Sequence, residues 1–305
     1  MLDPLFASLP TLPRNTNREV PAPIAPKTPV VIPTEIKRGD VIQLGAHRIM
    51  CGDAGSPEDV ATLFGDVKPD LVFTSPPYAQ QRTYVNGIGD WDVLMQRVFG
   101  AMPWHDKTQV LVNLGLVHNK GEWQPYWDGW IEWMRGEGWR RFGWYVWDKL
   151  DAMPGDWAGR LAPSFEFIWH FNKDRRKPNK TIPCKWAGTV KTRPNSGGLR
   201  KADGSTTSWN HDGKECQSFK IPDSTIRITP EKGGVRRDHP AVFPVALPLA
   251  IHAAYTDPGD VVYDPFGGSG TSIIAAEQGK RICYAMEIEP SYVQIAVDRY
   301  NKSLK

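Results

Sequence analysis

Residues 260–279 read DVVYDPFGGSGTSIIAAEQG, and this stretch decides the fold. An apolar run of strand length leads into a glycine-rich loop at 267–270, and apolar residues at helical spacing follow the loop. Residues 281–300, RICYAMEIEPSYVQIAVDRY, repeat the order of strand, turn and helix. The sequence therefore predicts two consecutive strand–helix units, the first with a glycine loop at its helix N-terminus.

The spacing of one acidic residue indicates a ribose-binding unit. Glu287 follows Gly268 by 19 residues and ends the second predicted strand. A carboxylate at this distance binds the ribose hydroxyls in Rossmann-type units. Two other interpretations stay open: glycines that serve only a tight strand-to-helix turn, and a nicotinamide or flavin site. The second is disfavoured because no third glycine completes the G-x-G-x-x-G spacing.

The position of this unit in the chain constrains the topology. Only 35 residues follow Gly270, which is room for one helix, one strand and one further helix. Two strands do not make a stable doubly wound sheet, so the remaining strands must come from earlier in the chain. The predicted fold is α/β, with a Rossmann-like, doubly wound, mostly parallel sheet whose motifs follow a circularly permuted order.

The earlier strands are visible as short apolar runs that end in turn residues. We expect them at HRIMCGD (47–53), DLVFTSPPY (70–78), QVLVNLG (109–115), RRFGWYVWDK (140–149) and SFEFIWHFNK (164–173).

Composition predicts a soluble cytoplasmic protein without a metal site. Of the 305 residues 40% are hydrophobic and 23% charged, enough to bury a sizeable core. The longest apolar stretch, 241–255, contains two prolines and is too short to span a bilayer, and no export pattern opens the chain. The four cysteines form no C-x-x-C pair, so we predict neither a zinc site nor a disulfide framework.

Two segments break the alternation of strands and helices. Residues 1–35 are rich in proline, which favours an extended arm or linker. Residues 174–235 are polar and rich in Gly, Ser, Thr, Asn and Pro, and an inserted module fits them better than a structureless loop. From Lys173 to Arg237 the chain carries 16 Lys and Arg against 6 Asp and Glu, a basic block that suggests a polyanionic partner.

The turn TSPPY at 74–78 offers an unusual set of acceptors. Adjacent prolines remove two N–H donors and fix two φ angles, so the turn is stiff and rich in carbonyl oxygens. The lone pair of an exocyclic amine on a base is conjugated into the ring. Acceptors at Ser75 Oγ and the Pro76 carbonyl would take its protons and free that lone pair for attack, while Tyr78 would stack on a base flipped out of the duplex.

These motifs together identify a family. TSPPY before a basic segment, then HPAVFP at 239–244 and DPFGGSGT at 264–271, resemble the β class of S-adenosylmethionine-dependent DNA amino-methyltransferases, over roughly residues 38–300. WDK (147–149) and EFIWHFNK (166–173) also match the family's paired strands after the catalytic loop. Across the whole chain the similarity is to stand-alone, phage-associated modification enzymes.

The resemblance implies a role for particular residues. The target-base site would comprise Ser75, Pro76, Pro77 and Tyr78. S-adenosylmethionine would be bound by Asp53, Thr74, His239, Phe243, Asp264, Phe266, Gly268, Ser269, Gly270, Thr271 and Glu287. Among these, Glu287 would hold the ribose, Asp53 the adenine amine, and Phe266 would face the sulfonium. The reaction would be a direct displacement without a covalent enzyme intermediate.

The target base is the open point of this resemblance. Ser75 at the first motif position favours cytosine N4, whereas the whole-chain similarity favours adenine N6, and we expect adenine with cytosine as the alternative. More distant alternatives are an RNA methyltransferase and an inactive DNA-binding homologue. No cysteine stands in a loop like that of the ring-carbon methyltransferases, so cytosine C5 is disfavoured.

The expected partner is double-stranded DNA, bound through phosphate contacts from the basic block. The candidates are Arg175, Arg176, Lys177, Lys191, Arg193, Arg200 and Lys201. A homodimer and a cognate endonuclease are further partners that such enzymes can have. The expected organisation is a Pro-rich arm or linker (1–35), a catalytic half (36–173), a target-recognition region (174–237) and a cofactor-binding half (238–305).

Overall fold

The computed structural model describes residues 35–78, 90–152, 155, 157, 159–190, 198–208, 213–230 and 243–304. The chain divides into two compact units. The smaller comprises Pro178–Pro222, and the larger is formed by the described residues before and after it.

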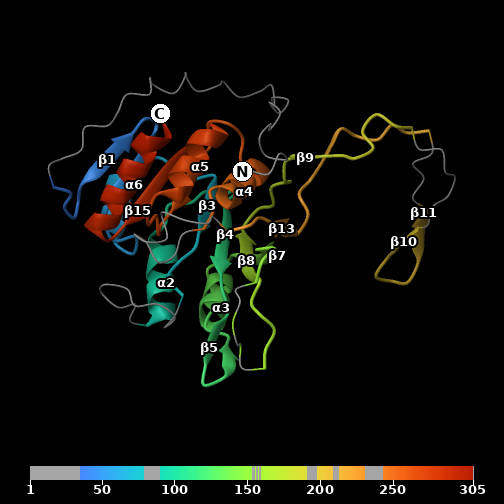
Figure 1. Cartoon of the computed structure of the whole chain (residues 1–305), viewed down its shortest axis with the longest axis horizontal. Coiled ribbons are helices and arrows are strands. Elements are labelled where there is room, and N and C mark those ends of the chain that lie inside the picture. Colours follow the sequence, from blue (N-terminus) through green and yellow to red (C-terminus); the bar gives the residue numbers. More distant parts are fainter. Residues whose placement is uncertain are drawn as a thin grey trace. The chain divides into compact units, whose positions relative to one another are not determined.

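The larger unit is built on a nine-stranded sheet of order β1-β2-β15-β14-β3-β4-β8-β7-β13 (Figure 1). Its strands are β1 (Val41–Leu44), β2 (His47–Cys51), β3 (Leu71–Thr74), β4 (Gln109–Leu114), β7 (Arg140–Asp148), β8 (Phe165–Asn172), β13 (Thr225–Arg227), β14 (Val261–Asp264) and β15 (Ile282–Glu287). Only β1 and β8 run against the other strands of this sheet. The C-terminal strands β14 and β15 lie between β2 and β3, which confirms the permuted order and the mostly parallel sheet.

Helices cover the sheet of the larger unit on both faces. They are α1 (Pro57–Phe64), α2 (Trp91–Ala101), α3 (Asp128–Gly136), α4 (Ala246–Tyr255), α5 (Thr271–Gly279) and α6 (Pro290–Ser303). One core cluster contains apolar side chains of α1, α2 and α3, and the other contains side chains of α4, α5 and α6. The fold is therefore doubly wound, as the sequence predicts.

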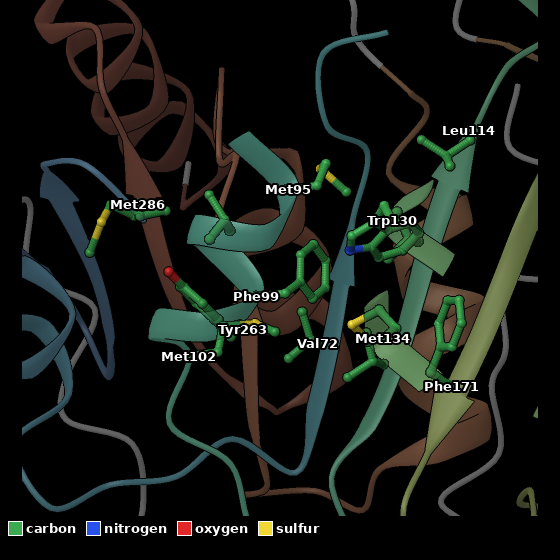
Figure 2. Packing of buried hydrophobic residues seen from close by; sticks show 14 of the residues in the cluster. Val72, Met95, Phe99, Met102, Leu114, Trp130, Met134, Phe171, Tyr263 and Met286 are labelled. Carbon is green, nitrogen blue, oxygen red and sulfur yellow. The ribbon is translucent and has the colours of Figure 1, made fainter. Parts of the chain in front are cut away.

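Strand β3 shows how one short run serves both layers. Val72 packs into the core with α2 and α3, while its neighbours Leu71 and Phe73 pack into the core with α4 and α5. Side chains alternate between the two faces of a strand, so a continuous apolar run is what a strand buried on both sides requires. Figure 2 shows Phe99 of α2 and Trp130 of α3 close to Val72.

The aromatic helix α3 belongs to this core. Trp130 is 0% exposed and packs edge to face on Trp91, with ring centroids 5.9 Å apart. The tryptophans of 127–134 therefore include core residues, which favours packing against the domain over use as an interface.

Local capping sets the starts of the helices. At α1, Ser56 Oγ accepts a hydrogen bond from Asp59 N at 3.2 Å, and Pro57 occupies the first turn. At α2, Asp90 Oδ1 accepts from Val93 N at 3.2 Å. Helix α5 differs, because it begins after Gly270 with no side-chain cap.

Among the described residues, three short antiparallel strand pairs lie outside the large sheet. Two antiparallel pairs belong to the smaller unit: β9 (Ile182–Pro183) with β12 (Phe219–Lys220), and β10 (Gly198–Arg200) with β11 (Thr206–Ser208). In the larger unit β5 (Val117–Asn119) pairs with β6 (Glu122–Gln124). Within the described ranges, no helix combines the length and apolar character needed to cross a bilayer.

Candidate active site

Two predicted loops leave the sheet side by side. Strands β3 and β14 are parallel neighbours, with Leu71 opposite Val262 and Val72 opposite Tyr263. The TSPPY turn follows β3 and the glycine loop follows β14, so both begin at the carboxyl edge of the sheet, where ligands bind in open α/β folds. A hydrogen bond joins the two strand ends, from Thr74 Oγ1 to Asp264 Oδ1 at 2.7 Å.

Asp264 ties three elements together. Its carboxylate also accepts from Ser272 Oγ of α5 at 2.6 Å and from Phe266 N at 3.2 Å. The side chain is 1% exposed, and burial raises the pKa of the carboxyl above its usual value. The geometry gives Asp264 the task of fixing the glycine loop against the TSPPY turn.

The glycines of the loop allow close packing that a side chain would prevent. Gly270 has φ +78, and a Cβ there would lie 2.8 Å from Ala296 Cβ of α6. A Cβ on Gly267 would lie 3.1 Å from Ala285 Cβ of β15. At Gly270 both the backbone conformation and the approach of α6 favour glycine, whereas at Gly267 only the close approach of β15 does.

Glu287 stands at the end of β15 and faces this loop. Its Oε2 accepts from Gly268 N at 2.8 Å and its Oε1 accepts from Glu289 N at 2.9 Å. Burial raises the pKa of the carboxyl, although these backbone donors oppose the shift. Each oxygen retains a lone pair after these contacts, so the carboxylate can accept from the two hydroxyls of a ribose.

Asp53 reaches the same edge from β2. Cys51 of β2 pairs with Glu287 of β15, and Gly52 N donates to the Glu287 carbonyl at 3.0 Å. The Asp53 carboxylate accepts from Gly55 N at 2.8 Å and forms an ion pair with Arg97 Nη2 of α2 at 2.6 Å. The predicted contacts to adenosine, Asp53 and Glu287, therefore follow neighbouring strands.

Arg299 is a site residue that sequence reasoning missed. Its Nη1 donates to the Ser269 carbonyl at 2.6 Å, to Ser269 Oγ at 2.7 Å and to Thr271 Oγ1 at 3.0 Å. The hydroxyls of Ser269 and Thr271, which are predicted to contact the cofactor, therefore accept hydrogen bonds from Arg299 of α6. No sequence signal marks this arginine, because its partners lie about 30 residues away and meet it only when α6 packs on α5.

The TSPPY turn is held by side chains of β8 and α2. Tyr78 OH donates to Glu166 Oε2 of β8 at 2.7 Å and lies 3.2 Å from Ser75 Oγ. Trp91 Nε1 of α2 donates to the Pro77 carbonyl at 2.8 Å. Burial and the nearby Glu166 raise the pKa of Tyr78 well above its ordinary value, so the phenol keeps its proton.

The Tyr78 ring is more enclosed than stacking on a base would suggest. The residue is 8% exposed, and a Cβ on Gly115 would lie 2.8 Å from its ring. Stacking of Tyr78 on a flipped base remains a prediction from the sequence.

Asn113 and Lys149 complete the surroundings of the turn. Asn113 Nδ2 lies 3.1 Å from Tyr78 OH and 2.5 Å from Glu166 Oε2, and Lys149 Nζ lies 2.6 Å from Glu166 Oε1. Asn113 and Glu166 gave a usable signal in the sequence, since each is a polar residue inside an apolar strand. Their convergence on Ser75 depends on strand order, which the sequence does not show directly.

The remaining predicted residues differ in position. Phe266 packs against one core cluster, and the ring of Phe243 lies 5.9 Å from that of Phe73. Arg200 and Lys201 are exposed in the smaller unit. His239, Lys191 and Arg193 lie outside the described residues.

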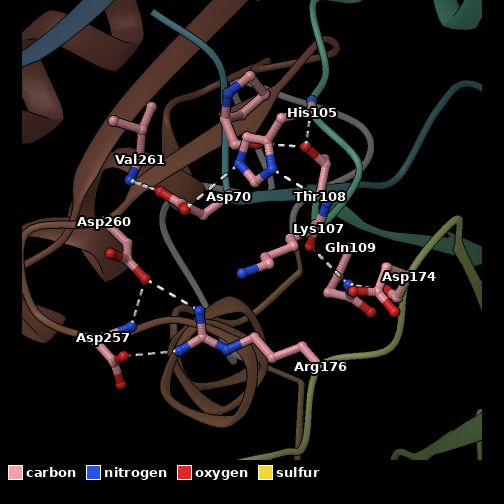
Figure 3. A network of polar contacts seen from close by, with 11 residues as sticks. Asp70, His105, Lys107, Thr108, Gln109, Asp174, Arg176, Asp257, Asp260 and Val261 are labelled. Carbon is pink, nitrogen blue, oxygen red and sulfur yellow. Dashed lines mark hydrogen bonds and ion pairs between the residues drawn. The ribbon is translucent and has the colours of Figure 1, made fainter. Parts of the chain in front are cut away.

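Three predicted DNA contacts, Arg175, Arg176 and Lys177, lie at the opposite edge of the sheet from the loops. They follow β8, whose end at Asn172 pairs with Gln109 at the start of β4. Arg176 forms ion pairs with Asp257 at 3.0 Å and Asp260 at 3.2 Å (Figure 3). Arg176 thus contacts the turn before β14, and its predicted contact with DNA stays a prediction.

The chain resembles DNA methylases in sequence and in fold. A family model described as DNA methylase, of the N6/N4 type, matches residues 69–298. The type II methyltransferase M.Cfr9I of Citrobacter freundii is 33% identical over 162 residues, which are 52% of this chain and 45% of that protein. The chain therefore spans about half the length of this curated relative.

Solved structures share the fold at lower identity. The PvuII DNA methyltransferase, described as cytosine-N4-specific, matches with a TM-score of 0.56 and 21% identity, over 83% of this chain and 85% of that one. The M1.HpyAVI–SAM complex matches with a TM-score of 0.52 and 19% identity, over 83% of this chain and 98% of that one. Because the family model matches most of the chain, including both loops of the site, this protein belongs to the DNA methylase family of the N6/N4 type.

Proposed function

We propose that this protein transfers a methyl group from S-adenosylmethionine to the exocyclic amine of a base flipped out of double-stranded DNA. The observation that carries the proposal is the Thr74–Asp264 hydrogen bond of 2.7 Å, which joins the acceptor turn to the glycine loop at one edge of the sheet. Family membership supports the same reaction class.

The residues around the glycine loop fit S-adenosylmethionine. Helix α5 begins after Gly270 without a side-chain cap, so its first N–H groups suit the carboxylate of the methionine part. Glu287 would accept from the ribose hydroxyls and Asp53 from the adenine amine. Phe266 would lie against the cationic centre. When bound, S-adenosylmethionine supplies an electrophilic methyl group on a sulfonium.

The TSPPY turn would prepare the amine. Ser75 Oγ and the Pro76 carbonyl would accept its two protons, which draws the nitrogen toward tetrahedral geometry and frees its lone pair. The prolines at 76 and 77 present no N–H group that would compete. In the displacement, the amine nitrogen would take the methyl group as the bond from that carbon to sulfur breaks, and one amine proton would pass by way of the acceptors at the turn to solvent.

The target base is proposed from two observations. Ser75 is the first residue of the SPPY motif at 75–78, where the family resemblance favours cytosine, and the structural relative from the PvuII system is described as cytosine-N4-specific. We therefore propose cytosine N4, with adenine N6, the expectation from whole-chain similarity, as the alternative.

The smaller unit is the proposed site of DNA recognition. Arg200 and Lys201 are exposed there, and phosphate contacts from such residues would provide affinity. Lys191 and Arg193 belong to the same proposal, whereas Arg176 does not. A homodimer and a cognate endonuclease stay expectations of the family resemblance.

Product analysis tests this function. The protein is incubated with S-adenosylmethionine and DNA of mixed sequence, and the DNA is digested to nucleosides and examined by mass spectrometry. We expect N4-methylcytosine, while N6-methyladenine would support the alternative base. A product of 5-methylcytosine, or DNA without any methylated base, would contradict amine methylation.

A further inference from the structure

A chain of polar side chains runs from Ser75 to β8. Ser75 Oγ lies 3.2 Å from Tyr78 OH, Tyr78 OH lies 2.7 Å from Glu166 Oε2, and Lys149 Nζ lies 2.6 Å from the other oxygen of Glu166. The Glu166 side chain is 11% exposed and that of Lys149 is 24% exposed. The chain thus ends in a largely buried ion pair.

The directions of the hydrogen bonds in this chain are determined by proton counting. A carboxylate only accepts, so Tyr78 must donate its single hydroxyl proton to Glu166. The Tyr78 oxygen is then an acceptor toward Ser75, and the Ser75 hydroxyl must be the donor in that contact. Once its proton points to Tyr78, Ser75 Oγ presents lone pairs to its other neighbours.

Asn113 is oriented by the same carboxylate. Its Nδ2 lies 2.5 Å from Glu166 Oε2 and 3.4 Å from Ser75 Oγ. The opposite orientation of the amide would place Oδ1 against the carboxylate, which is repulsive. Asn113 Oδ1 is then a buried acceptor for which the described residues provide no donor.

We propose that Glu166 is a positioning residue that fixes the hydrogen-bond direction of Ser75, so that the turn presents acceptors and no donor to the target base. The inference rests on the proposed function and adds a reason for its base class. An exocyclic amine donates to such a turn, whereas the O4 of thymine and the O6 of guanine are acceptors and would meet like groups. Glu166 thereby makes the turn selective for cytosine and adenine.

Glu166→Gln tests this direction because Lys149 orients the new amide. With Oε1 facing the lysine, Nε2 faces Tyr78 and donates to its oxygen, and the phenol proton then turns toward Ser75. The Ser75 hydroxyl becomes a donor toward the amine. We expect kcat to fall by about 100-fold, the effect of one misplaced polar group at a reacting centre, with KM for S-adenosylmethionine changed by less than about threefold.

The double variant Glu166→Gln/Lys149→Met separates direction from structure. Without the lysine, the amide can turn Oε1 toward Tyr78 and Asn113, which restores the original direction. We expect kcat of the double variant to be about tenfold higher than that of Glu166→Gln, because the lysine that holds the amide in the reversing orientation is gone. A purely structural role of Glu166 predicts a further fall of kcat in the double variant, because the contact of Lys149 is lost as well.

Two further variants complete the experiment. Glu132→Gln makes the same change at a carboxylate of α3 whose side chain is 57% exposed, and it should leave kcat unchanged. Tyr78→Phe removes the link between Ser75 and Glu166 with little change of shape, and it should lower kcat as strongly as Glu166→Gln. Calorimetric binding of S-adenosylmethionine shows for each variant that the cofactor half is folded.

The outcomes distinguish the inference from the function. A fall of kcat in Glu166→Gln that is partly recovered in the double variant supports the proposed hydrogen-bond direction from Ser75 to Tyr78. If Glu166→Gln or Tyr78→Phe turns over like the wild type, or if the folded double variant is no faster than Glu166→Gln, the inference is wrong while the function stands. If the wild type itself methylates no base in DNA, the proposed function fails first, and the inference fails with it.

Discussion

Two buried histidines show how burial controls protonation at the scale of single residues. His170 and His252 are each 1% exposed, and burial lowers the pKa of both from 6.5 to about 3. His170 is neutral between Gln109 Oε1 at 3.0 Å and Tyr145 OH at 2.9 Å. His252 lies edge to face on Phe73 beneath the strand that leads to the TSPPY turn.

These histidines should make the fold sensitive to acid. In the unfolded chain they take up protons near pH 6.5, but in the folded protein only near pH 3. Their full contribution to the free energy of unfolding is therefore present above about pH 6.5 and is lost as the pH falls toward 3, by at most about 1.4 kcal/mol per unit for each histidine.

His252→Leu checks this sign. Urea unfolding at pH 7.5 and 5.5 should show a smaller loss of stability in the variant than in the wild type, because one titrating group is gone. His118→Leu is the matched control, since His118 is exposed on β5, and it should leave the difference unchanged. An equal loss in His252→Leu and the wild type would show that His252 does not titrate on unfolding.

For single residues, the sequence predicts the residues within motifs better than the residues that hydrogen-bond to them from elsewhere in the chain. Ser75 and Gly270 are found because consecutive residues with special chemistry surround them. Glu166 and Lys149 fall in matched motifs, but their role depends on a hydrogen bond to Tyr78, which is 88 residues from Glu166 in the chain. Arg299 has no motif, and only the packing of α6 gives it a role.

The glycine loop is the place where elements constrain one another most tightly. Gly270 combines φ +78 with a Cβ position 2.8 Å from Ala296 Cβ of α6. Gly121, in the turn between β5 and β6, also has positive φ, at +87, but a Cβ there would meet nothing within 4 Å. Alanine substitutions at the two glycines therefore separate the free-energy cost of positive φ from the cost of the contact with α6.

Gly270→Ala should lower the free energy of unfolding more than Gly121→Ala. Positive φ costs an alanine about 1–2 kcal/mol at either position, and overpacking against α6 adds about 1–3 kcal/mol at Gly270 alone. Only Gly270→Ala should also weaken binding of S-adenosylmethionine, because the displaced loop carries the N–H groups of α5. Thermal unfolding and calorimetry provide the two readouts, and equal effects of both substitutions would contradict close packing of α6 on the loop.

Elements with a single clear period were predictable, and those stabilised by neighbours were not. The predicted strands at 47–53, 109–115 and 164–173 correspond to β2, β4 and β8. Strand β13, by contrast, has three residues, Thr225–Arg227, inside a polar segment, and it forms by pairing with β7. So short a segment carries little periodicity, and tertiary pairing decides its conformation.

At the scale of the whole molecule, the arithmetic of chain length predicts the permuted order that the sheet shows. Too few residues follow the glycine loop to build a sheet alone, and β14 and β15 do insert between β2 and β3. The sequence does not predict that the positive charges of the basic block are divided between the larger and the smaller unit. Residues 175–177 and 200–201 are equally basic in the sequence. Residues 175–177 follow β8 at the amino edge of the sheet, opposite the TSPPY turn and the glycine loop, whereas residues 200–201 belong to the smaller unit.

This division predicts different salt dependences for DNA binding. In the double variant Arg200→Ala/Lys201→Ala, the slope of log K against log salt should fall by about 2, since each lost phosphate contact removes about 1. Arg175→Ala/Lys177→Ala removes the same charge at the amino edge and should change the slope less. Fluorescence anisotropy across a salt series measures both, and a larger change in the 175/177 pair would contradict the proposed DNA-binding unit.

The most direct test of the account asks whether the TSPPY turn acts on chemistry rather than on cofactor binding. Methyl transfer to mixed-sequence DNA is measured in a single turnover for the wild type and for Ser75→Ala, with calorimetric titration of S-adenosylmethionine in parallel. We predict that transfer in Ser75→Ala falls by about 100-fold, while the cofactor Kd stays within about twofold, because Glu287 and the glycine loop are untouched. Transfer at the wild-type rate in Ser75→Ala would contradict the claim that this turn holds the reacting amine.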